Sequence, residues 1–105
     1  MDIFFALSDP TRKNIIELLS SYGQLSASEI YIRFSVSAAA ISQHLKVLKI
    51  AKLVNVEKRS QQRIYTINKE SIIQLEEWAN MMRKQWELKF DNLDIILEEE
   101  KTKLK

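Results

Sequence analysis

The 105-residue sequence contains no cysteine, one histidine, one glycine and one proline. Without cysteine, the chain forms no disulfide, no thiolate metal site and no cysteine nucleophile. A lone histidine, His44, does not build a histidine-rich metal cluster. The single glycine, Gly23, excludes glycine-rich phosphate loops such as GxGxxG and the P-loop. We therefore expect no metal, no cofactor and no enzyme active site, and a mostly helical chain with short connections.

Long apolar stretches are also absent. No run approaches the roughly 18 residues of a transmembrane helix, and the first ten residues lack the basic segment of a secretory signal peptide. Hydrophobic residues nevertheless make up 46% of the sequence, which is enough for a packed core. The sequence thus predicts a cytoplasmic globular protein with no membrane partner.

The small net charge of +2 hides an uneven distribution. Residues 1–68 carry nine Lys or Arg against five Asp or Glu, whereas residues 69–105 carry seven against nine. This asymmetry predicts a basic, anion-binding domain over 1–68 and a C-terminal segment over 69–105 with another task, both within one compact unit. A basic run is often only a solvated face, and that alternative stays open.

Capping signals divide the first half into short helices. Residues 2–7 are predicted to form the first helix, which packs Ile3, Phe4 and Leu7 on the core. Asp9 and Pro10 begin a second helix that ends at Gly23. A Ser-x-x-Glu capping box at residues 26–29 begins a third helix, which is expected to end near residue 35.

Ser37 caps the next predicted helix, over residues 37–50. Its buried face is expected to consist of Ile41, Leu45 and Leu48. A turn of about three residues, 35–37, would separate it from the preceding helix, which is typical of a helix-turn-helix.

A β-hairpin and one long helix are predicted to follow. Residues 53–57 and 63–67 are rich in β-branched side chains, and residues 58–62 between them form a polar, basic tip. From Asn68 the chain is predicted to be helical to about residue 100. The expected fold is α+β and mostly helical, a winged helix-turn-helix with a two-stranded wing and a long C-terminal dimerisation helix.

The helix 37–50 is the candidate recognition helix of a DNA-binding protein. Small side chains near its N-terminus permit close approach to a major groove, and a glutamine such as Gln43 can pair bidentately with adenine. The predicted contacts in this helix are Ser37, Ala38, Ala39, Ser42, Gln43, His44, Lys46 and Lys49. For His44, contact with a phosphate and contact with its own domain are both open. An Ala-rich helix that simply packs tightly is the alternative for the whole segment.

The hairpin tip is the candidate wing. Lys58, Arg59 and Arg63 are predicted to contact phosphates or an adjacent minor groove. The alternative is a solvated turn, since hairpin tips are usually polar.

The last helix carries an apolar stripe in which the steps alternate between three and four residues. Aromatic residues at helical spacing form a core or an interface more often than a ligand site. A helix of about 30 residues does not bury such a stripe against its own small domain, so a homodimer is expected. The predicted dimer interface consists of Phe4, Leu75, Trp78, Met82, Trp86, Phe90 and Leu93.

Four segments occur together at a recognisable spacing: residues 5–12 (FALSDPTR), residues 16–19 (IELL), residues 37–48 (SAAAISQHLKVL) and residues 53–54 (LV). Over residues 3–67 they resemble the ArsR-type winged helix-turn-helix repressors. The tail, with its tryptophans, resembles the extended last helix of a non-metal-sensing branch of that family. The resemblance implies a dimeric transcriptional repressor that binds an imperfect palindrome in double-stranded DNA.

The chain departs from the family pattern at two usual glycine positions, which hold Lys52 and Ser60. Lys52 either adopts a left-handed cap at some energetic cost or the helix ends differently, and Ser60 leaves the turn type of the wing open. Metal-sensing members use cysteine in the third helix, or histidine and acidic residues in the last one. The matching helices here hold neither cysteine nor histidine, so the resemblance implies no metal sensing of that kind.

The sequence therefore predicts a DNA-binding transcriptional regulator, a dimeric repressor with helix 37–50 in the major groove and hairpin 58–63 as the wing. The alternative is a winged-helix protein-interaction module without sequence-specific DNA binding, which the acidic, aromatic-striped last helix favours. An inducer or a partner protein is a further possible ligand.

Overall fold

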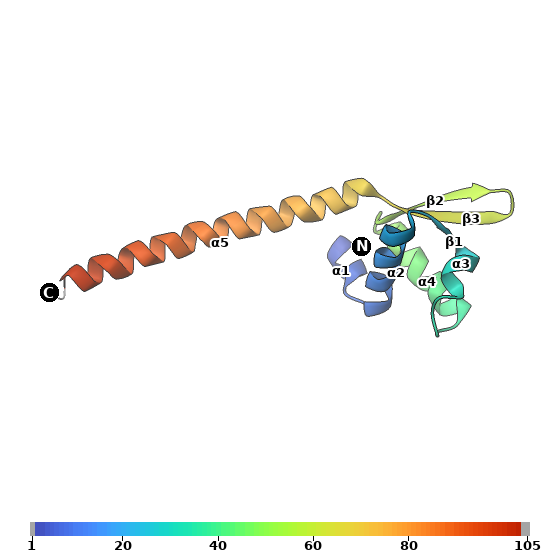
Figure 1. Cartoon of the computed structure of the whole chain (residues 1–105), viewed down its shortest axis with the longest axis horizontal. Coiled ribbons are helices and arrows are strands. Elements are labelled where there is room, and N and C mark those ends of the chain that lie inside the picture. The colour runs from blue at the N-terminus through green and yellow to red at the C-terminus, as the bar shows by residue number, and fades with distance from the viewer. Residues whose placement is uncertain (1, 104–105) are drawn as a thin grey trace. The chain divides into compact units, whose positions relative to one another are not determined.

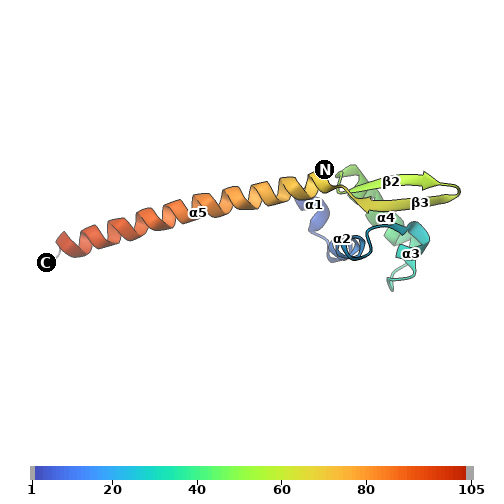
Figure 2. The ribbon, with the colours of Figure 1, turned by 45° about the horizontal axis from the view of Figure 1, so that its top comes forward.

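The computed structural model describes the backbone of residues 2–103 and the side chains of residues 2–91. The chain forms two compact units, Met1–Ile72 and Ile73–Lys105. The elements in chain order are α1 (Ile3–Leu7), α2 (Pro10–Tyr22), β1 (Leu25–Ser26), α3 (Ala27–Tyr31), α4 (Ala38–Ile50), β2 (Val54–Arg59), β3 (Gln62–Ile67) and α5 (Lys69–Lys103). Figures 1 and 2 show β2 and β3 as a hairpin that extends beyond helices α1–α4. The winged helix-turn-helix fold predicted from the sequence is confirmed.

Capping side chains begin the helices where the sequence predicts them. The Asp9 carboxylate accepts hydrogen bonds from the backbone N–H groups of Thr11 and Arg12 at 2.8 and 3.1 Å. Ser26 and Glu29 form the complete capping box of α3. These caps satisfy N–H groups that have no partner inside the helix, and each contributes about 1 kcal/mol.

The connection between α3 and α4 is longer than predicted. Helix α3 ends at Tyr31 rather than near residue 35, so the connection spans residues 32–37 instead of 35–37. After Tyr31 the backbone tightens, because the N–H groups of Arg33 and Phe34 donate to carbonyls three residues back, at 3.1 and 3.4 Å. Such bonds close a 3₁₀-type turn and stop the α-helix. Ile32, the first residue after α3, is 80% exposed.

The sheet has one strand more than the sequence predicts. The two-residue strand β1 pairs antiparallel with β3, and the order in the sheet is β1-β3-β2. The core lies between this sheet and helices α1–α4. Its largest fully buried side chains are Ile15, Leu19, Ile30, Ile41, Leu45, Leu48 and Leu53.

Helix α1 contributes less to the core than expected. Ile3 and Leu7 pack against the core, and Ala6 is buried. Phe4 is 47% exposed, so its predicted place in the core is wrong. A helix of five residues has room for only one inward-facing stripe, and in α1 Ile3, Ala6 and Leu7 form it.

The C-terminus of α4 is a Schellman motif in which Lys52 has a positive φ of 63°. The Lys52 N–H donates to the Lys49 carbonyl and the Leu53 N–H donates to the Leu48 carbonyl, both at 3.0 Å. These are the two hydrogen bonds that define the motif, and Leu48 and Leu53 supply its buried apolar contact. Of the two alternatives for this position, the left-handed cap is therefore the one that the structure adopts.

The start of α5 is attached to this motif. The Asn68 side-chain amide donates to the Lys52 carbonyl at 2.8 Å, and the Ser71 hydroxyl donates to the same oxygen. Ile72 packs on the core. These contacts explain why the first residues of α5 belong to the N-terminal unit.

The wing turn also uses a non-glycine residue with positive φ. The last cross-strand pair is Arg59 with Gln62, so Ser60 and Gln61 form the two-residue loop. Ser60 has φ 55°, and Gln61 is not among the described residues with positive φ. Positive φ at the first loop residue alone excludes a type I′ turn, which needs positive φ at both loop residues, and it matches the φ signs of a type II′ turn.

Helix α5 spans 35 residues, or about 50 Å, which confirms the long C-terminal helix. Seven large apolar side chains between residues 73 and 90 are exposed, and Trp86 is the most exposed of them at 70%. The side chain of Leu93, a predicted interface residue, lies outside the described residues. Among the residues that the structure describes, no helix is long and apolar enough to cross a membrane.

Candidate nucleic-acid interface

The outer face of α4 is polar and contains no carboxylate. Ser37, Ala38, Ala39, Ser42, Gln43, Lys46 and Lys49 are all exposed. The Ser37 hydroxyl accepts from the Ala40 N–H at 3.1 Å and so fixes the start of the helix. Ile41, Leu45 and Leu48 are buried as predicted, which turns the polar side chains outward.

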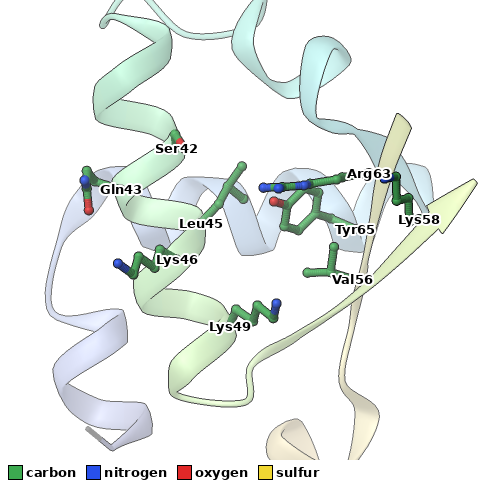
Figure 3. A pocket seen from close by; sticks show the side chains of 9 residues that line it. All are labelled: Ser42, Gln43, Leu45, Lys46, Lys49, Val56, Lys58, Arg63 and Tyr65. Atoms are coloured by element: carbon green, nitrogen blue, oxygen red, sulfur yellow. The ribbon is translucent and has the colours of Figure 1, made fainter. Parts of the chain in front are cut away.

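A groove of about 380 Å³ lies between α4 and the β2–β3 hairpin. Figure 3 shows Arg63 extending from β3 towards α4 above the Tyr65 ring. The groove is lined by Ser42, Gln43, Leu45, Lys46, Lys49, Val56, Lys58, Arg63 and Tyr65. Four of these side chains are cations and none is an acid. The arrangement favours a polyanion that lies along α4 and touches the hairpin.

The two predicted wing residues Arg63 and Lys58 line this groove, whereas the third, Arg59, does not. Arg59 donates to the Glu57 carboxylate at 2.9 Å and to the Gln24 side-chain oxygen at 3.4 Å. The hydrogen bond and ion pair with Glu57 raise the pKa of Arg59 and lower the pKa of Glu57. Because this ion pair is exposed, it stabilises the fold little, and the guanidinium can exchange partners.

A smaller cavity of about 230 Å³ lies between α3 and the turn end of the β2–β3 hairpin. Its lining includes Ser28 and Tyr31 of α3, Gln61 of the wing turn and Gln62 of β3. Arg63 lines this cavity as well as the groove. The Arg63 side chain therefore lies between the helix-turn-helix and the wing.

His44 lies on a different side of α4 and contacts its own domain. Its side chain is 22% exposed. Its Nδ1 lies 3.2 Å from Nη1 of Arg12 and 3.9 Å from Oδ1 of Asp9. The Arg12 backbone N–H, as the largest cause, holds the pKa of Asp9 below its usual value of 3.8.

Sequence reasoning missed two residues near the interface. Tyr65 appeared only as a strand residue, yet it is buried in the floor of the groove, where burial raises its pKa. Arg12 appeared only as part of a motif, although it contacts the recognition helix. No alternation of buried residues in β3 indicates Tyr65, because its neighbour Ile64 is buried as well. Nor does a local signal indicate the contact of Arg12 with His44, which is 32 residues away.

Groups of at least three histidine or acidic side chains that could hold a metal ion are absent from the described part of the chain. The predicted dimer residues Leu75, Trp78, Met82, Trp86 and Phe90 all lie on α5. Leu75 is half-buried, and the other four are exposed to solvent.

Comparisons with known proteins agree with this geometry. A helix-turn-helix domain family model matches residues 7–57. The transcriptional repressor SdpR of Bacillus subtilis is 37% identical over 67 residues, which cover 64% of this chain and 73% of that protein. The HTH-type transcriptional regulator Rv2034 of Mycobacterium tuberculosis is 43% identical over 63 residues, which cover 60% of this chain and 58% of that protein.

The fold has a similar counterpart among solved structures. An ArsR-like transcriptional regulator from Rhodococcus sp. RHA1 superposes with a TM-score of 0.82 and 28% sequence identity. The match covers 91% of this chain and 87% of that one, so it includes much of the long last helix.

Proposed function

The chain belongs to the ArsR family of DNA-binding helix-turn-helix transcriptional regulators, and from this premise we propose that it acts as a homodimeric repressor with α4 in the major groove and the β2–β3 hairpin as its wing. The observation that carries this assignment is the groove beside α4, whose four cations face no carboxylate. Each protomer would read one half-site, and the two half-sites would lie about one helical turn of DNA apart.

The proposed contacts divide into base readers and phosphate binders. Ser37, Ala38, Ala39, Ser42 and Gln43 approach the base edges. Lys46, Lys49, Lys58 and Arg63 bind phosphates around the groove, and His44 binds the backbone beside α4. On binding DNA, Arg59 leaves Glu57 and contacts a phosphate or the minor groove. This exchange changes the free energy little, because one exposed anionic partner replaces another.

The test begins with selection of bound sequences from random duplexes by the purified protein. Replacing Gln43 with alanine should then relax the sequence preference. Replacing Arg63 with alanine should weaken binding to every duplex and lower the slope of log affinity against log salt by about 0.9. Lys13→Ala is the matched control for lost charge, because Lys13 is exposed on α2 and does not line the groove.

Two outcomes would refute this assignment. Equal weakening of specific and scrambled duplexes by Gln43→Ala would remove its role as a base reader. A protein that shows no salt-sensitive DNA binding but forms a stable complex with another protein would instead be a winged-helix interaction module.

Dimerisation through α5 is supported by the apolar side chains that the helix exposes. Contiguous apolar surface on one face of a helix usually marks an interface. The proposed interface consists of Phe4, Leu75, Trp78, Met82, Trp86, Phe90 and Leu93. Trp86→Glu should shift the protein to monomers in sedimentation equilibrium, whereas Asn80→Glu places the same charge on the polar side of α5 and should leave the dimer intact. If both variants remain dimeric, the interface lies elsewhere.

We also propose that the signal that releases DNA is not a metal ion held by the sites usual for this family. The sequence has no cysteine, and its single histidine contacts Arg12. Addition of Zn²⁺, Cd²⁺ or arsenite should leave the affinity for the selected duplex unchanged. A metal-dependent loss of binding that chelation or a thiol competitor reverses would overturn this part of the proposal.

A further inference from the structure

Arg12 occupies the junction of α1, α2 and α4. Its Nε donates to the Ala6 carbonyl at 2.7 Å, and its Nη2 donates to the Phe5 carbonyl at 3.3 Å. The guanidinium also lies 5.5 Å from the centre of the Phe5 ring. Its remaining nitrogen, Nη1, lies 3.2 Å from Nδ1 of His44. Arg12 therefore uses three of its five N–H donors within the domain.

The chemistry of these groups determines where the proton of His44 sits. A guanidinium is always charged and only donates hydrogen bonds, so Nδ1 of His44 must accept the bond from Arg12. In a neutral imidazole the single proton is then on Nε2. The carboxylate of Asp9, the other charged group facing the ring, is 3.9 Å from Nδ1, which is too long for a competing hydrogen bond.

Nε2 of His44 is not fully buried. In the part of the chain with described side chains, no buried side-chain nitrogen or oxygen lacks a partner, and the contacts of His44 to Arg12 and Asp9 involve only Nδ1. Successive residues on a helix are about 100° apart, so His44 and Lys46 lie on opposite sides of the buried Leu45. Gln43 points outward between them. A helix in a major groove runs between two phosphate backbones, and these two side chains flank it on either side.

We propose that Arg12 is a positioning residue for DNA binding: it holds His44 in the Nε2–H tautomer, and this N–H donates to a backbone phosphate on the side of α4 away from the wing. Lys46 and the wing bind the other strand. The inference rests on the proposed DNA-binding function. It adds a residue that does not touch DNA and gives the imidazole a defined donor atom.

The tautomer can be measured without DNA. His44 is the single histidine of the sequence, so the untagged protein labelled with ¹⁵N gives one set of imidazole signals. The Nε2–H form should dominate in the wild type, and Arg12→Met should produce a mixture of tautomers. Arg33→Met is the matched control, because Arg33 also donates to a backbone carbonyl and stacks on a tyrosine ring, but these partners are Glu29 of α3 and Tyr22 of α2 rather than a residue of α4. An unchanged tautomer in Arg12→Met would overturn the proposal.

Binding to the selected duplex provides the second measurement. His44→Ala and Arg12→Met should each weaken binding about tenfold, and the double variant should be no weaker than His44→Ala. The salt slope should stay unchanged, because neither a neutral imidazole nor a guanidinium away from DNA releases counterions. A slope lowered by about 0.9 in Arg12→Met would mean that Arg12 itself binds a phosphate, and additive losses would mean that it acts independently of His44.

A rescue variant keeps the proposal testable if Arg12→Met unfolds. In His44→Gln, the side-chain amide can accept from Arg12 through its oxygen and donate to the phosphate through its nitrogen. This variant should bind close to wild type, whereas a loss equal to that of His44→Ala would refute the two-sided role of the ring. Failure of the wild type to bind any duplex would refute the proposed function. The tautomer measurement would still test whether Arg12 sets the tautomer of His44, because it needs no DNA.

Discussion

Replacing Lys52 with glycine should stabilise the N-terminal unit, whereas replacing it with alanine should leave the strain in place. Lys52 is the left-handed residue of the Schellman motif, with φ 63°. Its backbone N–H donates to the Lys49 carbonyl, and its own carbonyl accepts from Asn68 and Ser71. All of these contacts involve the backbone of Lys52, so they survive both substitutions.

The size of the effect follows from two opposing terms. A side chain in the left-handed conformation costs about 1–2 kcal/mol, and glycine removes that cost. Glycine also gains freedom in the unfolded chain, which offsets about 0.4–1 kcal/mol. The Lys52→Gly variant should therefore be more stable than the Lys52→Ala variant by about 0.5–1 kcal/mol. Asn14, an exposed position inside α2, serves as the control. There the order of stability should reverse, and the alanine variant should be more stable than the glycine variant by about 1 kcal/mol.

Thermal unfolding followed by circular dichroism would measure both pairs of variants. For a domain of this size, 1 kcal/mol shifts Tm by about 4–8 °C, which is readily resolved. All samples need the same protein concentration, because self-association makes Tm concentration-dependent. If the alanine variant is the more stable one at both positions, the left-handed backbone at Lys52 is not strained.

Three further predictions concern caps and charges. Ser37→Ala should lower the stability of the N-terminal unit by about 1 kcal/mol, measured by urea unfolding, because α4 loses its cap. Glu57→Gln should strengthen DNA binding several-fold at low salt and less at high salt, since it frees Arg59 and removes an anion near the wing; unchanged affinity would mean that Arg59 stays out of the interface. Hydrogen bonds from Ser26 hold the pKa of Glu29 below 4.5, so the stability that it contributes is complete above that pH and is lost as the pH falls through the lowered value. Unfolding midpoints between neutral pH and about pH 3 should therefore fall less in Glu29→Gln than in the wild type.

Local signals were enough to predict much of the fold. The caps at Asp9, Ser26 and Ser37 act within three residues of themselves, so the helix starts follow from short stretches of sequence. The buried face of α4 follows from helical spacing in the same way. A family resemblance then identified Lys52 and Ser60 as unusual, and both have positive φ.

Features that depend on distant contacts were not predictable from the sequence. Strand β1 has two residues and exists because β3 pairs with it. The end of α3 depends on a tightened turn that no glycine or proline marks. The contact of Arg12 with His44 and the withdrawal of Arg59 towards Glu57 are choices of side-chain partner, and such choices depend on the assembled tertiary structure.

The exposed apolar side chains of α5 relate the structure to the concentration of the protein in the cell. If the chain forms the proposed homodimer, a newly made chain that has not yet paired presents the exposed Trp86 to chaperones and proteases. In the proposed homodimer, the amount of paired repressor at low abundance grows with the square of the chain concentration. Repression would then set in over a narrow range of synthesis rates, and unpaired chains would be cleared while paired ones persist.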